Sequence, residues 1–137
     1  MTAALSLGLA RAAYEAALKY SRARVAFGKP IGEHQAIAFK LADMLTAIHG
    51  ARLTTYHAAW SLDQGLPVTR EAAMAKLVAS EMANRVADEA SRIFASYGFA
   101  MEYPVQRYFR DARFLLLGGG TSEILRVIIS KDLEWRA

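Results

Sequence analysis

Apolar residues recur every three or four positions along most of the chain, which is the spacing of one face of an α-helix. This pattern predicts three long helices, over roughly residues 2–24, 37–62 and 69–97. Two shorter helical stretches follow, one after Pro104 and one lined by Leu125, Ile129 and Leu133. No stretch alternates convincingly with a period of two residues, so we expect no β-sheet.

Glycine, proline and polar residues mark where these helices end. Residues 27–35, FGKPIGEHQ, interrupt the first pair of helices, and residues 63–67 predict a turn before the third. Thr69 is expected to be the N-cap of the third helix and Gly98 its C-cap. We therefore predict an all-α fold, an antiparallel four-helix up-and-down bundle with a short extra helix, in one domain spanning residues 1–137.

Composition and charge exclude several classes of protein. The chain has 137 residues, 54% of them apolar, yet no run approaches the roughly 18 apolar residues of a membrane span. It has no cysteine, which rules out disulfides, thiolate metal sites and a cysteine nucleophile, and which fits a cytoplasmic location. The first residues lack the pattern of a signal peptide. Because the net charge is only +4 and is spread along the chain, we expect no nucleic-acid partner.

Neither metal binding nor hydrolase chemistry is indicated by the polar residues. His34, His49 and His57 do not have the spacing of metal ligands on one helix face. No Ser-His-Asp set is evident. We therefore expect no metal site.

Two short stretches allow either a ligand or an ordinary structural role. Gly118–Gly120 precede a predicted helix whose free N–H groups would attract an anion, but a plain helix–helix connection explains them as well. Glu123 near that helix start fits simple complementarity with the helix dipole. At the first turn, Arg24 could bind a phosphate while Phe27 covers an aromatic ring, or the turn could be a solvated basic loop.

Several motifs, read in order, resemble those of acyl-CoA dehydrogenases. Tyr20–Ile31, YSRARVAFGKPI, followed by Gln35 and by Leu41–Met44, LADM, matches the family signature. Further matching motifs at the expected intervals are Ala51-Arg52, Ala75-Lys76, Tyr97-Gly98, Glu102–Val105, Tyr108–Ala112 and Gly120–Ile124. The resemblance covers nearly the whole chain.

The resemblance implies a flavoenzyme of three parts, of which this chain corresponds only to the C-terminal helical bundle. Family members use FAD to dehydrogenate an acyl-CoA thioester between its α and β carbons, while a carboxylate removes the α-proton. The implied partners are acyl-CoA, an electron-transfer flavoprotein, and further copies in a homodimer or homotetramer formed through the bundle. We expect the isolated chain to be inactive and to bind FAD weakly or not at all.

The resemblance also implies positions that contact the cofactor. Arg24 and Phe27 match a turn that contacts the pyrophosphate and adenosine part of FAD, typically of a neighbouring subunit, and Gln35 matches a further adenosine-side contact. Thr121 and Glu123 match residues that approach the cofactor from the start of the last helix.

Two departures from the family pattern affect the expected chemistry. Many members carry the catalytic Glu at the position of Gly119. Some branches place this Glu on the first helix instead, at a position that would fall just before Met1 of this chain. At residues 92–98, RIFASYG replaces Gln-Ile-x-Gly-Gly-x-Gly, so Arg92 and Ser96 stand at cofactor-binding positions. Two alternatives therefore remain open, a flavin oxidase or monooxygenase relative and a non-catalytic helical oligomerisation module.

Overall fold

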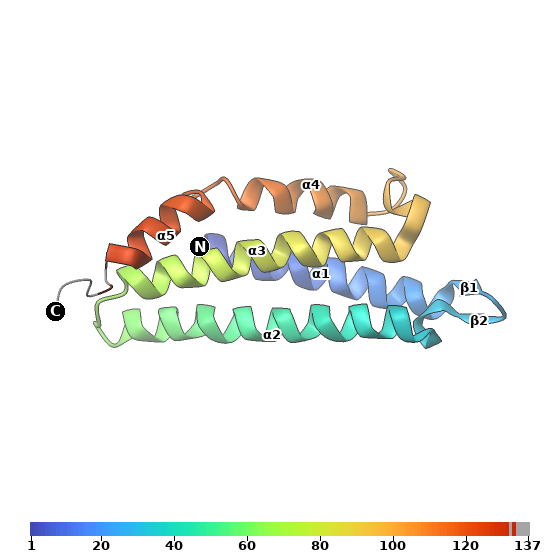
Figure 1. Cartoon of the computed structure of the whole chain (residues 1–137), viewed down its shortest axis with the longest axis horizontal. Coiled ribbons are helices and arrows are strands. Elements are labelled where there is room, and N and C mark those ends of the chain that lie inside the picture. The colour runs from blue at the N-terminus through green and yellow to red at the C-terminus, as the bar shows by residue number, and fades with distance from the viewer. Residues whose placement is uncertain (132, 134–137) are drawn as a thin grey trace.

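The computed structural model describes residues 1–131 and 133. Its element order is α1 (Thr2–Ala23), β1 (Val25–Ala26), β2 (Lys29–Pro30), η1 (Ile31–Glu33), α2 (Gln35–Asp63), α3 (Thr69–Phe94), η2 (Ala95–Gly98), α4 (Val105–Leu115) and α5 (Ser122–Lys131). The helices α1, α2 and α3 run antiparallel, and α4 and α5 return end to end along α3 (Figure 1). The predicted all-α four-helix bundle is confirmed, with its fourth position divided between α4 and the short α5.

The helix α3 is central, because it contacts α1, α2, α4 and α5. Both α3 and α1 carry many small buried side chains, and small side chains allow two helix backbones to approach closely. The fully buried alanines on the two helices are Ala10, Ala13, Ala17, Ala79, Ala83, Ala87 and Ala90. Larger side chains fill the space toward α2, namely Leu41, Met44, Ile48, Met82 and Val86.

An aromatic cluster closes the core where α1 and α3 end. The Tyr20 ring stacks on Phe94 with centroids 4.1 Å apart, and the Tyr103 ring meets Phe94 edge-on at 5.3 Å. Burial raises the pKa of the Tyr20 hydroxyl, partly offset by Arg24. This cluster fixes the segment that follows α3 against the end of α1.

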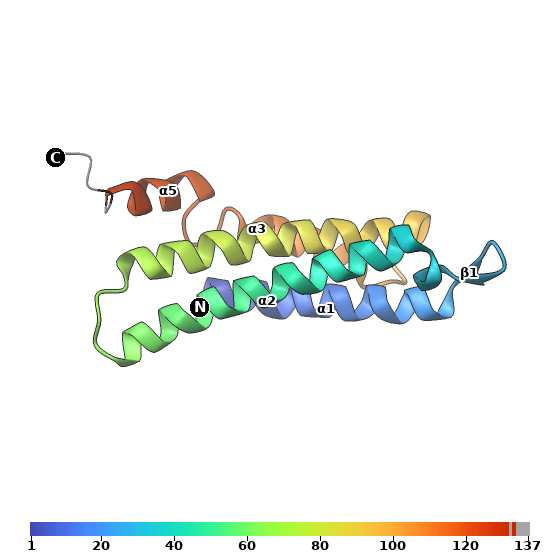
Figure 2. The same ribbon diagram turned by 60° about the horizontal axis from the view of Figure 1, so that its bottom comes forward.

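The expectation of no β-structure is wrong at one place. The two-residue strands β1 and β2 pair antiparallel, and Phe27 and Gly28 connect them at the far right of Figures 1 and 2. Both connecting residues have positive φ, 53° and 82°, as a two-residue hairpin loop requires. Strands of two residues are too short to produce an alternating pattern in the sequence.

The ends of two helices also differ from the predictions. The residue that ends α3 is Ala95, with φ 53° and ψ −131°, so the prediction of Gly98 as C-cap is wrong. Gly98 lies buried in η2. Glycine is required there for steric reasons, because a Cβ would lie 2.3 Å from the Ser91 carbonyl oxygen. The N-cap of α3 is Val68 and not Thr69, which is the first helical residue. Leu133 lies beyond the end of α5.

No helix within the described residues is both long enough and apolar enough to cross a membrane.

Candidate functional site

The residues predicted to bind the cofactor fall into two separate groups. Residues 24–35 and 92–98, here called the ribbon end, surround the hairpin and the end of α3. Residues 116–121, here called the glycine loop, connect α4 to α5 toward the opposite end of the bundle (Figures 1 and 2). Lys76, which contacts the glycine loop, and Arg92 are separated by roughly 24 Å along α3, at about 1.5 Å per residue. The structure therefore does not gather the predicted residues in one place.

Phe27 occupies an unusual place at the tip of the ribbon. Its φ is 53°, its side chain is 97% exposed, and its ring meets the His34 ring edge-on at a centroid distance of 6.1 Å. His34 Nε2 lies 3.1 Å from the Ala26 carbonyl oxygen, which holds that ring at the base of the hairpin. A bulky residue in the left-handed region is strained, and its exposed ring gains little from burial. The ring is consequently available to stack on a ligand or on another protein surface.

Arg24 lies exposed beside the segment that follows α3. Its guanidinium carbon is 5.8 Å from the centre of the Tyr97 ring, which is a cation–π contact. Among the described residues no carboxylate pairs with Arg24. A planar guanidinium held in this way fits a phosphate, which accepts its two parallel hydrogen bonds.

The remaining predicted residues of the ribbon end are less clearly suited to a ligand. Arg92 Nε donates to Asp88 Oδ2 at 2.7 Å, and this bond raises the pKa of the guanidinium. Arg92 is thus held against its own helix. Ser96 is exposed in η2, and Gln35 is exposed at the first turn of α2.

The glycine loop is anchored by a buried lysine, Lys76, which the sequence analysis names within the Ala75-Lys76 motif but to which it assigns no role. Lys76 Nζ donates to the Gly120 carbonyl at 2.6 Å and lies 3.5 Å from that of Leu116. The residue is only 6% exposed, and burial lowers its pKa, an effect that Glu81 opposes. Its signal in the sequence is its spacing, because Lys76 falls three and seven residues before Ala79 and Ala83 on the buried stripe of α3.

Two glycines of the loop have backbones that other residues rarely adopt. The φ angles of Gly119 and Gly120 are 72° and 97°. A Cβ on Gly119 would also lie 2.9 Å from Thr2 Oγ1, because the loop passes directly over the start of α1. Position 119 is thus built for a residue without a side chain.

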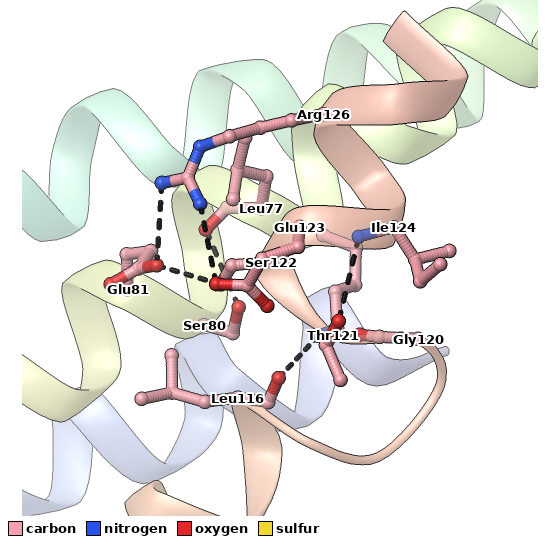
Figure 3. Close-up of polar contacts among 11 residues, drawn as sticks. Leu77, Ser80, Glu81, Leu116, Gly120, Thr121, Ser122, Glu123, Ile124 and Arg126 are labelled. Atoms are coloured by element: carbon pink, nitrogen blue, oxygen red, sulfur yellow. Dashed lines mark hydrogen bonds and ion pairs between the residues drawn. The ribbon is translucent and has the colours of Figure 1, made fainter.

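Thr121 and Glu123 take part in the first turn of α5 (Figure 3). The Ile124 N–H donates to Thr121 Oγ1 at 3.4 Å. Backbone N–H donation, then the Thr121 hydroxyl and the nearby Arg126, lower the pKa of the Glu123 carboxyl. These contacts show that both residues stabilise the start of α5, which is the structural role that the sequence allowed. Contact of either residue with the cofactor stays a prediction.

A polar cluster fastens α5 to α3 next to the loop. Ser122 Oγ donates to Glu81 Oε1 at 2.7 Å, and an Arg126 guanidinium nitrogen lies 3.7 Å from the same oxygen (Figure 3). The second Arg126 terminal nitrogen lies 4.0 Å from Glu123. The carboxylates of this region are therefore engaged within the chain.

The side chains of the ribbon end offer donors and a ring that suit FAD. Among the described residues no three His, Asp or Glu side chains come together as metal ligands. At the ribbon end, the exposed Arg24 guanidinium and Phe27 ring suit a pyrophosphate and an aromatic group. Ala95 and Ser96 place side chains on the neighbouring surface, where the family resemblance implies bare backbone.

Comparison with known proteins gives a close relative. The chain is 55% identical, over 134 residues, to the benzylmalonyl-CoA dehydrogenase of Aromatoleum aromaticum, covering 98% of this chain and 36% of that protein. It is 46% identical to the mitochondrial short-chain specific acyl-CoA dehydrogenase of Bos taurus, covering 96% of this chain and 32% of that protein. The chain thus spans about a third of the length of the relatives it matches.

Solved structures agree with these relatives. Butyryl-CoA dehydrogenase of Megasphaera elsdenii superposes with a TM-score of 0.93 at 46% identity, covering 95% of this chain and 34% of that one. A chain in the structure of the electron transferring flavoprotein of Acidaminococcus fermentans gives 0.96 at 41% identity, covering 98% and 36%. The FAD complex of PigA gives 0.90 at 31% identity, covering 94% and 34%.

The family model described as "Acyl-CoA dehydrogenase, C-terminal domain" matches residues 1–134. Together with the bundle architecture, this match shows that the chain belongs to the family of acyl-CoA dehydrogenase C-terminal domains.

Proposed function

We propose that this chain forms the C-terminal part of an FAD-dependent enzyme that dehydrogenates an acyl-CoA thioester between its α and β carbons. The observation that carries the proposal is the family match over residues 1–134. When bound, FAD supplies the redox chemistry by accepting a hydride. The residues of this chain bind and orient the cofactor, and their isolated domain has no turnover of its own.

The ribbon end would hold the distal half of FAD. Arg24 would donate to the pyrophosphate, and Phe27 and Gln35 would contact the adenosine part, with Arg92 and Ser96 beside them. The Arg24 guanidinium, with which no carboxylate of the described residues pairs, and the exposed Phe27 ring support these roles. Thr121 and Glu123 would approach a cofactor at the other end of the bundle, so that one chain contributes to two flavin sites in an oligomer.

We further propose a homodimer or homotetramer formed through the bundle. The outward face of α2 carries large apolar side chains that the described chain leaves exposed, namely Phe39, Leu53, Tyr56 and Trp60. A patch of this kind is typical of a protein–protein contact. An electron-transfer flavoprotein as redox partner and a cytoplasmic location complete the proposal, the former supported by the likeness to a chain in such a structure.

The substrate we propose is a CoA thioester whose acyl group carries a second carboxyl group on its α carbon. Its support is the 55% identity to a protein named for benzylmalonyl-CoA, a compound of this class.

The test uses the protein encoded by the complete reading frame that contains these residues. The purified protein should contain FAD. When it is mixed anaerobically with acyl-CoAs, it should lose the yellow colour of the oxidised flavin. Arg24→Gln should lower its FAD content, because a neutral amide replaces the guanidinium fork at the phosphates. The matched control is Arg11→Gln, a change in an exposed arginine of α1 that pairs with Glu15.

Two outcomes would favour the alternatives. A flavin that no acyl-CoA bleaches without oxygen would indicate an oxidase or monooxygenase, for which Gly119 and the altered residues 92–96 are the motive. An absence of companion domains in the reading frame, together with no FAD binding, would indicate a helical oligomerisation module.

A further inference from the structure

The backbone of Arg24 is fixed on both sides, whereas its side chain is long and exposed. The Arg24 N–H donates to the Tyr20 carbonyl oxygen at 2.8 Å, and the Arg24 carbonyl oxygen accepts from the Ile31 N–H at 2.8 Å. These two bonds hold the residue between the end of α1 and the segment that follows the ribbon. They do not fix the guanidinium, which reaches into solvent on a flexible stem. An arginine of this kind has much rotamer freedom to lose when it binds a ligand.

The Tyr97 ring lies against this guanidinium. The distance from the Arg24 guanidinium carbon to the centre of the Tyr97 ring is 5.8 Å. The Tyr97 ring in turn contacts the ring of Tyr103, with centroids 5.4 Å apart, and the Tyr103 ring meets the buried Phe94 ring at 5.3 Å. A row of aromatic rings therefore connects the exposed guanidinium to the core.

The turn that carries Tyr97 is fixed by two features of its backbone. Ala95 has a strained conformation, with φ 53° and ψ −131°. Gly98 packs so closely that a Cβ there would lie 2.3 Å from the Ser91 carbonyl oxygen. Tyr97 lies between these two positions in η2 and is 44% exposed. The turn thus holds the Tyr97 ring in a defined place although much of it lies outside the core.

An aromatic ring is a suitable neighbour for an arginine that has to bind an anion. The face of the ring attracts a cation but carries no net charge, so the guanidinium keeps its positive charge for a ligand. A carboxylate at the same place would cancel that charge. Among the described residues no carboxylate pairs with Arg24, and Arg92 of the ribbon end donates instead to Asp88 on its own helix.

We infer that Tyr97 is a positioning residue for the proposed cofactor site, which holds the Arg24 guanidinium in place to donate to the pyrophosphate of FAD. This inference rests on the proposed function and deepens it. Because the ring restrains the guanidinium before FAD binds, less rotamer freedom is lost on binding and the affinity is higher. In a purely structural role, Tyr97 would only shield Tyr103 from water, and its effect on FAD would not depend on Arg24.

The experiment measures the dissociation constant of FAD for the protein encoded by the complete reading frame, after its cofactor has been removed. Tyr97→Leu should raise this constant about fivefold, which is the size expected of a partly exposed cation–π contact. In an Arg24→Gln background the cation is absent, so the same change should have little further effect. Tyr97→Phe keeps the ring and should bind FAD as the unaltered protein does.

A matched pair of rings separates attraction for the cation from shape. Tyr97→Phe and Tyr97→pentafluorophenylalanine place rings of similar size at this position, but the fluorines withdraw electron density from the face of the ring and remove its attraction for a cation. We expect the fluorinated variant to bind FAD about fivefold more weakly than the Phe variant, with no loss of stability in urea unfolding. This pair also gives the answer if Tyr97→Leu does not fold.

Each outcome decides the inference. Equal FAD affinities for the two ring variants, or an effect of Tyr97→Leu that is the same with and without Arg24→Gln, would overturn it and leave the dehydrogenase proposal intact. If Arg24→Gln does not change the affinity for FAD, the proposed role of Arg24 is wrong and the inference is wrong with it, while bleaching by acyl-CoAs would still support a dehydrogenase. If the complete protein binds no FAD, both proposals are wrong.

Discussion

The ribbon end and the glycine loop both need backbone with positive φ, and they meet this need in opposite ways. In the loop, Gly119 and Gly120 have φ angles of 72° and 97° without steric cost. At the ribbon end, Phe27 and Ala95 each have a φ of 53°, which is strained for residues with a Cβ. The loop thus has glycine at its positive-φ positions, while the ribbon end has residues with side chains at strained positive-φ positions.

A glycine with positive φ and a larger residue with positive φ therefore indicate different things about a site. At position 119 the positive φ and the 2.9 Å approach of a Cβ to Thr2 Oγ1 leave little room for a side chain. At position 27 an exposed phenyl ring is retained under strain, which is a reason to expect that it contacts something outside this chain. Substitutions at both ends can test whether this distinction holds.

The largest effect is expected for Gly98→Ala, at the ribbon end. The new Cβ would lie 2.3 Å from the Ser91 carbonyl oxygen, a backbone atom that cannot rotate away. We expect the free energy of unfolding to fall by about 3 kcal/mol, measured by urea unfolding. The control is Gly50→Ala, because a Cβ at Gly50 in α2 meets nothing within 4 Å and should stabilise the helix slightly. Equal urea midpoints for the two variants would contradict the packing described here.

Lys76→Met tests how strongly the glycine loop is held. The change leaves the Gly120 carbonyl oxygen without its donor inside the protein. A loss of about 2 kcal/mol in the free energy of unfolding is expected. Lys19→Met, in an exposed lysine of α1, should change it little. A midpoint shift no larger than that of this control would show that the loop does not depend on Lys76.

Gly119→Ala tests the close contact between the loop and α1. The variant combines a strained positive φ with a contact of 2.9 Å to Thr2 Oγ1, and we expect a loss of about 1.5 kcal/mol. Combining it with Thr2→Ala should recover the steric part of the loss, which a double-mutant cycle measures as a coupling energy. A coupling energy of zero would place Thr2 away from the loop.

Ala95→Gly should have the opposite sign. Glycine adopts a φ of 53° and ψ of −131° freely, so the strain disappears, although the unfolded chain gains some freedom. The expected net change is a stabilisation by about 1 kcal/mol in thermal or urea unfolding. Ser96→Gly is the control, since Ser96 has no positive φ, and it should destabilise slightly. A destabilising Ala95→Gly would mean that the methyl group makes a contact worth more than the strain.

The helices could be predicted from the sequence because periodicity over more than ten residues averages out local exceptions. The predicted helices over 2–24 and 37–62 agree with α1 and α2 to within about two residues at each end. Single-residue predictions at helix ends were weaker. Gly98 has the residue type of a C-cap, but the chain turns at Ala95, because the position of Gly98 is fixed by packing against Ser91.

The candidate site residues can be proposed from the sequence, but their arrangement in space cannot. Motif order singled out Arg24, Phe27 and Gly119; the structure leaves Arg24 and Phe27 exposed and gives Phe27 and Gly119 a positive φ, while their contact with a cofactor stays a prediction. Lys76 is part of a matching motif, but its role could not be predicted, because its acceptors are the carbonyls of Leu116 and Gly120, 40 and 44 residues away. The separation of the two groups of residues likewise depends on how α3 spans the bundle, which no local pattern encodes.

The smallest effect is expected at Glu123, whose carboxyl pKa is lowered mainly by backbone N–H donation at the start of α5 and by Thr121. The folded chain therefore keeps this carboxylate charged at a pH where the unfolded chain, with an ordinary value near 4.5, takes up a proton. Its stabilising contribution is complete well above pH 4.5 and is lost as the pH falls through the folded pKa. Glu123→Gln should thus lower stability near neutral pH, and its difference from the unaltered chain should shrink in acid. Glu102→Gln, in an exposed glutamate, is the control, and a difference that does not vary with pH would show that the carboxylate charge does not stabilise α5.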